Sequence, residues 1–308
     1  MSKLLYAGMR RYRKSIVFWL ALLATIICGV LHGYNTKTTA LNDTYIIAEF
    51  VIFSIMITWL VGREFDEGTF RNKVIAGHSK SKIYISELIL GIAVCLAFFL
   101  IYAISFAAFN LYVFNIIPAI MLIKVFVSIL LANVGIVVIL TTISCLLTRR
   151  AIIAIVNILL VVVMMFCSYA LDTSLREPEY YTEYDYEQVE IKDENGNVHS
   201  YEKPILESEH QVKNKMYLGG WKRSIAKNSY YFLPAGQVTN SVHLMEPYLG
   251  EERYNRLLEL GYDKSDETSI LSVNMREKEL KIDFLYSSIL LLIVPLAGLA
   301  LFRKKDFK

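Results

Sequence analysis

Residues 119–171 read AIMLIKVFVSILLANVGIVVILTTISCLL-TRR-AIIAIVNILLVVVMMFCSYAL, which is two long apolar runs joined by three polar residues. The hydrocarbon core of a bilayer is about 30 Å thick, and an α-helix needs about 20 apolar residues to cross it. Each run meets that length, and only Thr148, Arg149 and Arg150 separate them. The stretch therefore predicts a tight antiparallel pair of membrane-spanning helices.

Further runs of the same kind lie at about 16–33, 45–62, 84–109 and 284–302. The chain has 308 residues, 55% of them hydrophobic, and a mean hydropathy of +0.42. Backbone polar groups in lipid must be paired within their own segment, and transmembrane strands would alternate polar with apolar residues, which these runs do not. We predict an all-α polytopic membrane protein with six transmembrane helices.

Lys and Arg fall mainly on one side of the predicted membrane. They gather in the first 14 residues, in the loop after the second run, at 149–150 and after residue 302, whereas the opposite short loops hold only Lys37 and Lys124. Basic residues mark cytoplasmic loops. We therefore expect both termini to be cytoplasmic and residues 172–283 to be extracellular.

These limits predict four parts. An N-terminal interfacial helix occupies residues 1–15, where Leu5, Met9 and Tyr12 recur at helical spacing among basic residues. The alternative is an ordinary basic flank of the first span. Spans one to five occupy residues 16–171, an extracellular domain occupies 172–283, and the sixth span with a basic tail occupies 284–308.

The predicted extracellular segment is too long for a simple loop, and we expect a small α+β domain. Residues 188–192 alternate, Asn195-Gly196 suits a two-residue turn, and Val198 and Tyr201 lie on the return strand. Residues 248–260 carry a helical pattern that Gly261 would end, and the aromatic segment 230–234 suits the outer membrane surface.

The charge of this segment leaves two interpretations open. Residues 172–283 hold 22 Asp and Glu against 14 Lys and Arg. This balance is either a solvated surface or an attraction for a cationic peptide.

The loop at 63–82 is the most informative stretch of the sequence. Phe65, Phe70 and Val74 could form the apolar stripe of a short helix, Gly77 would end it, and Ser79 or Ser81 could cap the next helix. A loop that is merely polar and caps its own helices is the alternative interpretation.

A resemblance favours the functional interpretation of this loop. Glu67-Gly68-Thr69, Arg71-Asn72-Lys73, Gly77-His78-Ser79-Lys80 and Ile83-Tyr84 together resemble the coupling loop of type-2 ABC exporter permeases, most closely those of Gram-positive bacteria. The six-span order, the N-terminal helix and the enlarged segment before the sixth span fit the same family. Glu87 departs from it, since a neutral or basic residue is expected there.

The resemblance implies a place in the bacterial plasma membrane and a separate ABC ATPase subunit that binds the loop and carries ATP and magnesium. It also implies pairing with a second permease copy or a related permease, contact with membrane lipids and none with nucleic acid. The expected docking residues are Glu67, Gly68, Thr69, Arg71, Asn72 and Lys73.

The sequence holds no Gly-x₄-Gly-Lys-Ser/Thr run for cradling phosphate, so we expect no cofactor and no ATP site in this chain. His199, His210 and His243 are scattered without ligand spacing, and we expect no metal and no catalytic residue. All four cysteines lie within predicted spans, which argues against a disulfide framework.

A few polar residues fall within the runs. His32, Glu49, Glu87 and Lys124 lie near predicted span ends, where they are expected to reach water. Asn133 and Asn157 lie deeper and favour hydrogen bonds between helices, with a polar transport path as the alternative.

The sequence thus predicts a permease subunit that couples a separate ATPase to outward movement of a substrate, with a peptide as the preferred cargo. The alternative is a non-transporting receptor or immunity protein whose extracellular domain senses a ligand. An intramembrane enzyme is disfavoured because no paired catalytic residues lie at membrane depth.

Overall fold

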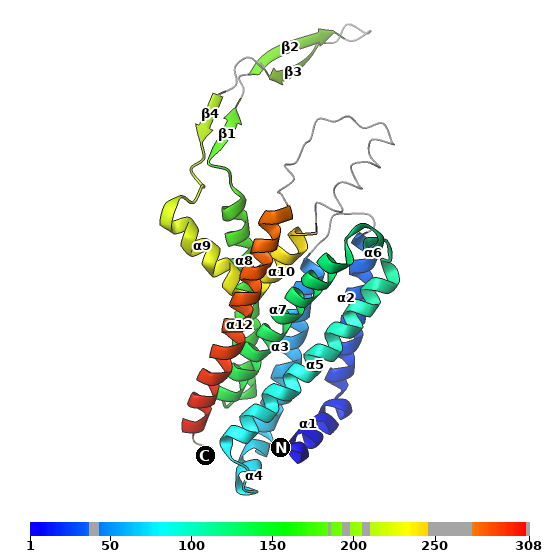
Figure 1. The fold of residues 1–308 in the computed structure, drawn as a ribbon, viewed down its shortest axis with the longest axis vertical. Coiled ribbons are helices and arrows are strands. Elements are labelled where there is room, and N and C mark those ends of the chain that lie inside the picture. Colours follow the sequence, from blue (N-terminus) through cyan, green and yellow to red (C-terminus); the bar gives the residue numbers. More distant parts are fainter. Residues whose placement is uncertain (37–42, 184–185, 193–197, 205–209, 246–272, 306–308) are drawn as a thin grey trace. The chain divides into compact units, whose positions relative to one another are not determined.

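The structure is a computed structural model that describes residues 1–36, 43–183, 186–192, 198–204, 210–245 and 273–305. The chain divides into two compact units (Figure 1). The first, called the bundle below, contains residues 1–168 and 230–308, and the second, called the hairpin unit, contains residues 169–229. Each unit is described by itself.

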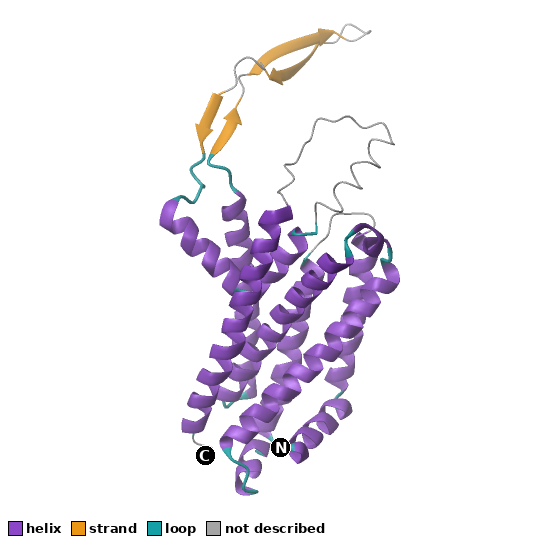
Figure 2. Cartoon of the chain, viewed as in Figure 1, coloured by secondary structure: helices purple, strands orange, loops and turns teal. Residues whose placement is uncertain are grey.

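Helices dominate the described chain (Figure 2). Their bounds are α1 Ser2–Lys14, α2 Ile16–Thr36, α3 Thr44–Asp66, α4 Thr69–Ile75, α5 Lys80–Phe109, α6 Tyr112–Ile116, α7 Ala119–Leu146, α8 Arg150–Arg176, α9 Gly220–Phe232, α10 Pro234–His243 and α12 Val273–Lys304. Six of them are long and apolar enough to cross a membrane: α2, α3, α5, α7, α8 and α12. The predicted number and order of candidate spans is confirmed, and the chain has the build of a multi-pass membrane protein.

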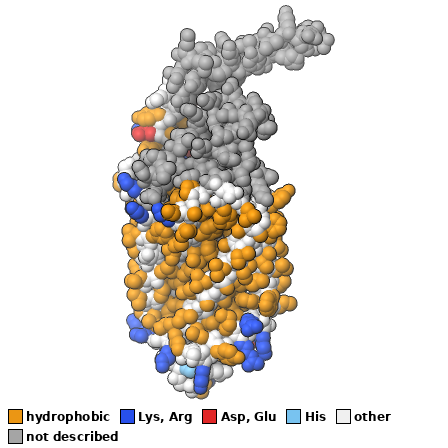
Figure 3. All heavy atoms as spheres, turned by 45° about the vertical axis from the view of Figure 1, so that its right-hand side comes forward, with side chains coloured by type: hydrophobic (Ala, Val, Ile, Leu, Met, Phe, Trp, Pro, Cys, Tyr) orange, Lys and Arg blue, Asp and Glu red, His pale blue; other side chains and the backbone are white. Residues whose placement is uncertain are grey.

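The spans run well beyond several of the apolar stretches. Helix α3 continues to Asp66, α8 continues to Arg176, and α12 begins at Val273. The cause is that polar residues continue the helix wherever no breaker follows, so hydropathy marks the part inside lipid rather than the whole helix. Figure 3 shows a broad band of hydrophobic side chains, with Lys and Arg at both of its borders. One border is the end of the bundle that carries both chain termini (Figure 1). We call this end the terminal end.

Close packing of α2 against α5 depends on two glycines. A Cβ on Gly29 would lie 2.8 Å from the Tyr102 carbonyl oxygen, and a Cβ on Gly33 would lie 2.6 Å from that of Phe106. Both distances are too short for a real side chain, so only glycine lets the two backbones meet here. Small residues four apart are a common device for helix contact in membranes.

Helix α10 belongs to the bundle, although its residues were expected in an extracellular domain and its first residue, Pro234, in the segment 230–234 on the membrane surface. Residues 234–242 are all buried. Polar side chains of α10 are matched by partners on α12, on α7 and at the residue that precedes α3. Asn240 Nδ2 donates to Asp283 Oδ2 on α12 at 2.6 Å, and Ser287 Oγ donates to Gln237 Oε1 at 2.7 Å.

Two further bonds of α10 reach α7 and the residue that precedes α3. Ser241 Oγ lies 2.9 Å from Ser128 Oγ, and Thr239 Oγ1 donates to Asp43 Oδ2 at 2.5 Å. These hydroxyls and amides have partners inside the bundle. The polar helix α10 can therefore be buried, because its side chains exchange hydrogen bonds with water for hydrogen bonds with the bundle.

The hairpin unit contains two antiparallel strand pairs. Strand β1 (Tyr180–Glu183) pairs with β4 (His210–Lys213), and β2 (Tyr186–Lys192) pairs with β3 (Val198–Pro204). The predicted hairpin is confirmed, but its register places Lys192 opposite Val198. A two-residue turn at 195–196 would place Lys192 opposite residue 199, one position further along. Residues 195–196 themselves, and the helix expected at 248–260 with its stop at 261, lie outside the described residues.

Helix α1 has the amphipathic form expected of residues 1–15. Leu4, Gly8 and Tyr12 are buried at successive helical turns, and Met9 packs against the core. A Cβ on Gly8 would lie only 2.2 Å from Leu90 Cδ1, so α1 rests closely on α5. Its basic side chains Arg10, Arg13 and Lys14 remain exposed.

Candidate functional site

The predicted short helix in the 63–82 loop is present as α4, and its two flanking glycines set its limits. Gly68 precedes the helix with φ 64°, and Gly77 follows it with φ 84°. These left-handed conformations favour glycine, because a Cβ would clash with the backbone. Ser79 then caps α5, accepting a hydrogen bond from the Lys82 backbone N–H at 3.4 Å. The chain therefore turns sharply on both sides of α4.

The inner face of α4 is fixed by aromatic packing. Phe70 is 1% exposed, and its ring stacks on Phe65 with centroids 4.2 Å apart. Phe65 lies at the end of α3 rather than on the short helix, so the predicted apolar stripe is shared between two helices. The rings of Phe70 and Phe302 on α12 pack edge to face, with their centroids 6.0 Å apart.

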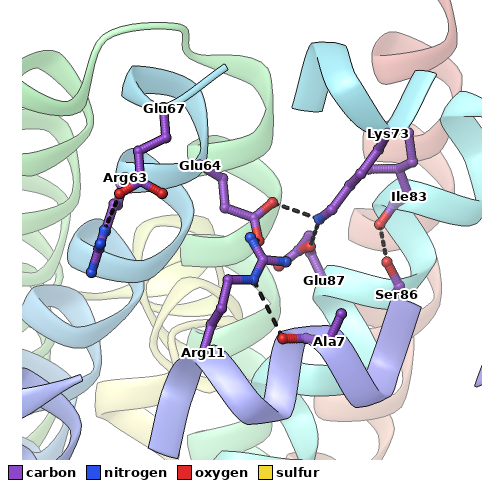
Figure 4. Close-up of polar contacts among 9 residues, drawn as sticks. All are labelled: Ala7, Arg11, Arg63, Glu64, Glu67, Lys73, Ile83, Ser86 and Glu87. Carbon is purple, nitrogen blue, oxygen red and sulfur yellow. Dashed lines mark hydrogen bonds and ion pairs between the residues drawn. The ribbon is translucent and has the colours of Figure 1, made fainter. Parts of the chain in front are cut away.

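A buried group of charges, the ionic cluster, joins α4 to three other helices (Figure 4). Its members are Arg11 on α1, Glu64 on α3, Lys73 on α4 and Glu87 on α5. Lys73 Nζ lies between two carboxylates, 2.6 Å from Glu64 Oε2 and 2.7 Å from Glu87 Oε1. Arg11 Nη1 lies 2.5 Å from the other oxygen of Glu64.

The charges within the ionic cluster balance, and their surroundings are largely closed to water. The side chains of Lys73, Glu64 and Glu87 are 9%, 9% and 2% exposed. Burial alone would lower the pKa of Lys73, but the carboxylates of Glu87 and Glu64 outweigh it and raise that pKa above its usual value. Lys73 therefore remains protonated at neutral pH and holds the two carboxylates together.

Tyr12 lies in the same environment. Burial, reinforced by Glu87 and Glu64, raises the pKa of Tyr12 well above its usual value. Its phenol therefore stays neutral next to the ionic cluster.

The outer face of α4 carries different chemistry. Arg71, Asn72 and Ile75 are exposed, and the Ile75 side chain is 73% exposed although it is large and apolar. An apolar residue flanked by a guanidinium and an amide can be covered by a protein partner that buries the isoleucine and pairs with the polar groups. We call these three residues the outer face of α4.

The expected docking residues divide between the two faces. Arg71 and Asn72 lie on the outer face, Thr69 begins the helix, and Gly68 provides the turn before it. Glu67 is exposed and forms an ion pair with Arg63 at 2.5 Å, one helical turn before it. Lys73 differs from the expectation: it points into the bundle, where a partner cannot reach its ammonium group.

Sequence reasoning missed the roles of Glu64 and Arg11. Glu64 ends an apolar run and Arg11 belongs to a run of basic residues, so neither stood out. The available signal was Glu87, the acidic residue that departed from the family pattern. Its position is explained by Lys73, because the two residues form a buried ion pair between α4 and α5.

Other polar residues of the spans were only partly anticipated. His32 and Glu49, expected to reach water, are each 3% exposed and face other helices. His32 Nδ1 lies 2.6 Å from Tyr102 Oη, and Glu49 Oε2 accepts from Thr25 Oγ1 at 3.2 Å. Glu87 is likewise buried, as described above.

The two asparagines at membrane depth differ from each other. Asn157 Nδ2 donates to Thr58 Oγ1 at 3.0 Å and to Ser144 Oγ at 2.9 Å, so it joins α8 to α3 and α7 as expected. Asn133 donates within its own helix, to the Ile129 carbonyl at 3.0 Å.

Within the described ranges, no group of three or more His, Cys, Asp and Glu side chains is arranged to hold a metal ion. The four cysteines are free thiols.

The fold and the site together define a multi-pass helical membrane protein with a short amphipathic helix fastened to the terminal end of its bundle. Neither protein-family models, nor curated proteins, nor solved structures gave a match to this chain.

Proposed function

We propose that this chain is the permease subunit of an ATP-driven ABC exporter, and that α4 is the helix on which a separate ATPase subunit docks. The observation that carries the proposal is the division of α4 into two faces. Its inner face is tied to α1, α3 and α5 by the ionic cluster, and its outer face presents Arg71, Asn72 and Ile75. The likeness of residues 67–84 to the coupling loop of such permeases supports the same assignment.

This arrangement suits a part that receives force. A partner that displaces α4 acts on a rigid unit, since buried charge pairs resist separation far more strongly than exposed ones. The displacement would pass through Lys73 to the end of α3 and the start of α5, which are two spans at once. ATP and magnesium would be held by the partner, because the sequence holds no phosphate-cradling loop.

The proposed topology follows from the same assignment. The terminal end of the bundle, with α4 and both chain termini, would face the bacterial cytoplasm, and the hairpin unit would face outward. A second permease copy or a related permease would complete the exporter against the apolar surfaces of the spans. Phe166 on α8 and Leu292 on α12 are 71% and 63% exposed and suit contact with lipid or with that copy.

Affinity purification from a host that expresses an ABC ATPase subunit tests the proposal. Wild-type chain should retain the ATPase, identified by peptides that carry its phosphate-binding loop. Arg71→Glu should reduce its recovery at least tenfold, because reversing the charge removes the guanidinium that would pair with a carboxylate of the partner and repels that carboxylate. Arg10→Glu is the matched control, since Arg10 is exposed on α1 outside the outer face of α4.

Equal recovery of the ATPase by wild type and Arg71→Glu would show that the outer face of α4 is not the docking surface. Absence of any ATPase from wild-type preparations would favour the alternative, a receptor or immunity protein. The hairpin unit is the feature that favours this alternative, since paired strands can present a ligand-binding surface.

A further inference from the structure

The last residues of α12 are tied to α4 and α7 by contacts that the docking proposal does not use. Lys305, just after α12, donates through Nζ to the carbonyl oxygens of Cys145 at 2.7 Å and Leu147 at 2.8 Å. These carbonyls belong to the end of α7, where backbone oxygens lack partners within the helix and a cation is favoured.

The same ammonium group reaches the α4 region. Lys305 Nζ lies 4.0 Å from the centre of the Phe65 ring, and Phe65 stacks on Phe70 of α4. A cation over an aromatic face is attracted by the negative charge of the ring face. Phe302 lies one turn before Lys305 and is 0% exposed. The centre of its ring lies 6.0 Å from that of Phe70 and 5.6 Å from that of Tyr84.

Reciprocal bonds join α12 to the start of α5. Lys80 Nζ donates to the carbonyl oxygens of Arg303, at 3.3 Å, and of Lys305. Arg303 Nε in turn donates to Ser81 Oγ at 2.8 Å. The end of α12 is therefore held on three sides, by α5, α7 and the Phe65–Phe70 pair.

We propose that Phe302 and Lys305 form a transmission clasp that carries displacement of α4 to α12 and α7, so that Lys305 is a positioning residue of the coupling machinery. This inference rests on the proposed function of α4. The ionic cluster links α4 to α1, α3 and α5, and the clasp links it to α12 and, through Lys305, to α7. Phe70 places α4 against Phe302 of α12, while Lys305 joins the end of α12 to Phe65 of α3 and to the carbonyl oxygens at the end of α7.

The clasp predicts that disturbing one of its ends loosens the other. Coupling between two sites is reciprocal, so a change at Lys305 must be felt at α4 if a change at α4 is felt at α12. This can be measured in the full chain without an ATPase. A nitroxide spin label is placed at Ile75 on α4, or at Leu301 on α12, which are 73% and 54% exposed. The four native cysteines are first replaced by alanine; Cys145 contributes only its carbonyl to the clasp.

Lys305→Met keeps the length of the side chain and removes its donors and charge. It should at least double the fraction of mobile label at both position 75 and position 301, in lipid nanodiscs at pH 7. Lys305→Arg should restore the wild-type spectra at both positions, because a guanidinium also donates to two carbonyls and stacks on an aromatic ring. Lys304→Met is the matched control, since Lys304 is exposed and adjacent, and both of its spectra should equal wild type.

Mobility that rises at position 301 alone would overturn the clasp, because it would reduce Lys305 to a local cap of α7. Equal effects of Lys304→Met and Lys305→Met would also overturn it. A second arm uses the ATPase recovered with wild-type chain: Lys305→Met should still retain the ATPase but lose at least half of the nucleotide-dependent spectral change at position 301. Failure of wild type to bind an ATPase would refute the docking proposal, while the spectra without ATPase would still decide the clasp.

Discussion

Replacing Lys73 by methionine tests the ionic cluster most sharply. The substitution keeps most of the side-chain volume and removes the ammonium group that Glu64 and Glu87 share at 2.6 and 2.7 Å. Arg11 still pairs with Glu64, so Glu87 becomes the uncompensated charge, with a side chain only 2% exposed. Removing one partner of a buried ion pair costs about 3–5 kcal/mol, because the remaining charge stays out of water. We expect Lys73→Met to lower the free energy of unfolding by that amount at pH 7.

The assay is reversible unfolding in mixed micelles, in which SDS is titrated into the detergent-solubilised chain and far-UV circular dichroism is recorded. Arg71→Met is the matched control: it removes a cation from the exposed face of the same helix and should change stability by less than about 0.5 kcal/mol. The double variant Lys73→Met with Glu87→Gln should recover most of the loss, because no buried charge is then left unpaired. Equal stability of Lys73→Met and Arg71→Met would refute the reasoning, as would a double variant less stable than Lys73→Met.

Four further outcomes follow from the structure. Because the pKa of Lys73 is raised above 10.5, its contribution to stability should be complete below that pH and lost as pH rises through the higher value, so the gap between wild type and Lys73→Met should stay constant from pH 7 to 10. Burial lowers the pKa of Lys305 to about 8, so the stability of wild type relative to Lys305→Met should increase as pH rises from about 8 towards 10.5, and a decrease would contradict the burial described. Asn157→Ala removes two hydrogen bonds between spans and should cost about 1–2 kcal/mol in the same SDS titration, whereas a neutral effect would show that these bonds do not stabilise the solubilised bundle. Gly68→Ala forces a Cβ into φ 64° and should cost about 1–2 kcal/mol, with no loss expected if the turn before α4 relaxes freely.

The elements that sequence could predict are those fixed by local pattern. Apolar runs give the six spans because lipid imposes a length and excludes unpaired backbone groups. Gly77 gives the end of α4 for an equally local reason, since its left-handed conformation lets the chain turn there, whereas Gly68, which lies inside the predicted stripe from Phe65 to Val74, was not expected to begin the helix. The β2–β3 hairpin likewise follows from alternation over adjacent residues.

The ionic cluster depends on tertiary packing and could not be predicted from local pattern. The four residues are distributed over four helices. Glu64 and Glu87 alone read as charges at span ends, Arg11 as one of several basic residues, and Lys73 as a docking residue. Only the folded chain shows that Lys73 turns inward while Arg71 and Asn72 turn outward. A helical period of 3.6 separates these faces but does not say which one is buried.

Helix α10 illustrates the opposite error, in which polar composition suggested exposure. Gln237, Thr239, Asn240 and Ser241 would suit a water-soluble domain, but each finds a partner on or beside a span. Burial of polar residues follows from the presence of partners, and those partners lie far away in the sequence. The same reason explains why Glu49 lies inside the bundle, where Thr25 supplies its hydrogen bond.

The central claim is that the outer face of α4 binds an ABC ATPase, and site-specific photocrosslinking tests it most directly. A photoreactive phenylalanine is placed at Ile75, 73% exposed on α4, or at Ile120, 70% exposed at the start of α7. After irradiation of living cells, the account predicts a crosslink from position 75 to a protein whose peptides include a phosphate-binding loop, and none from position 120. Absence of that product at position 75, or the same product at both positions, would contradict the account.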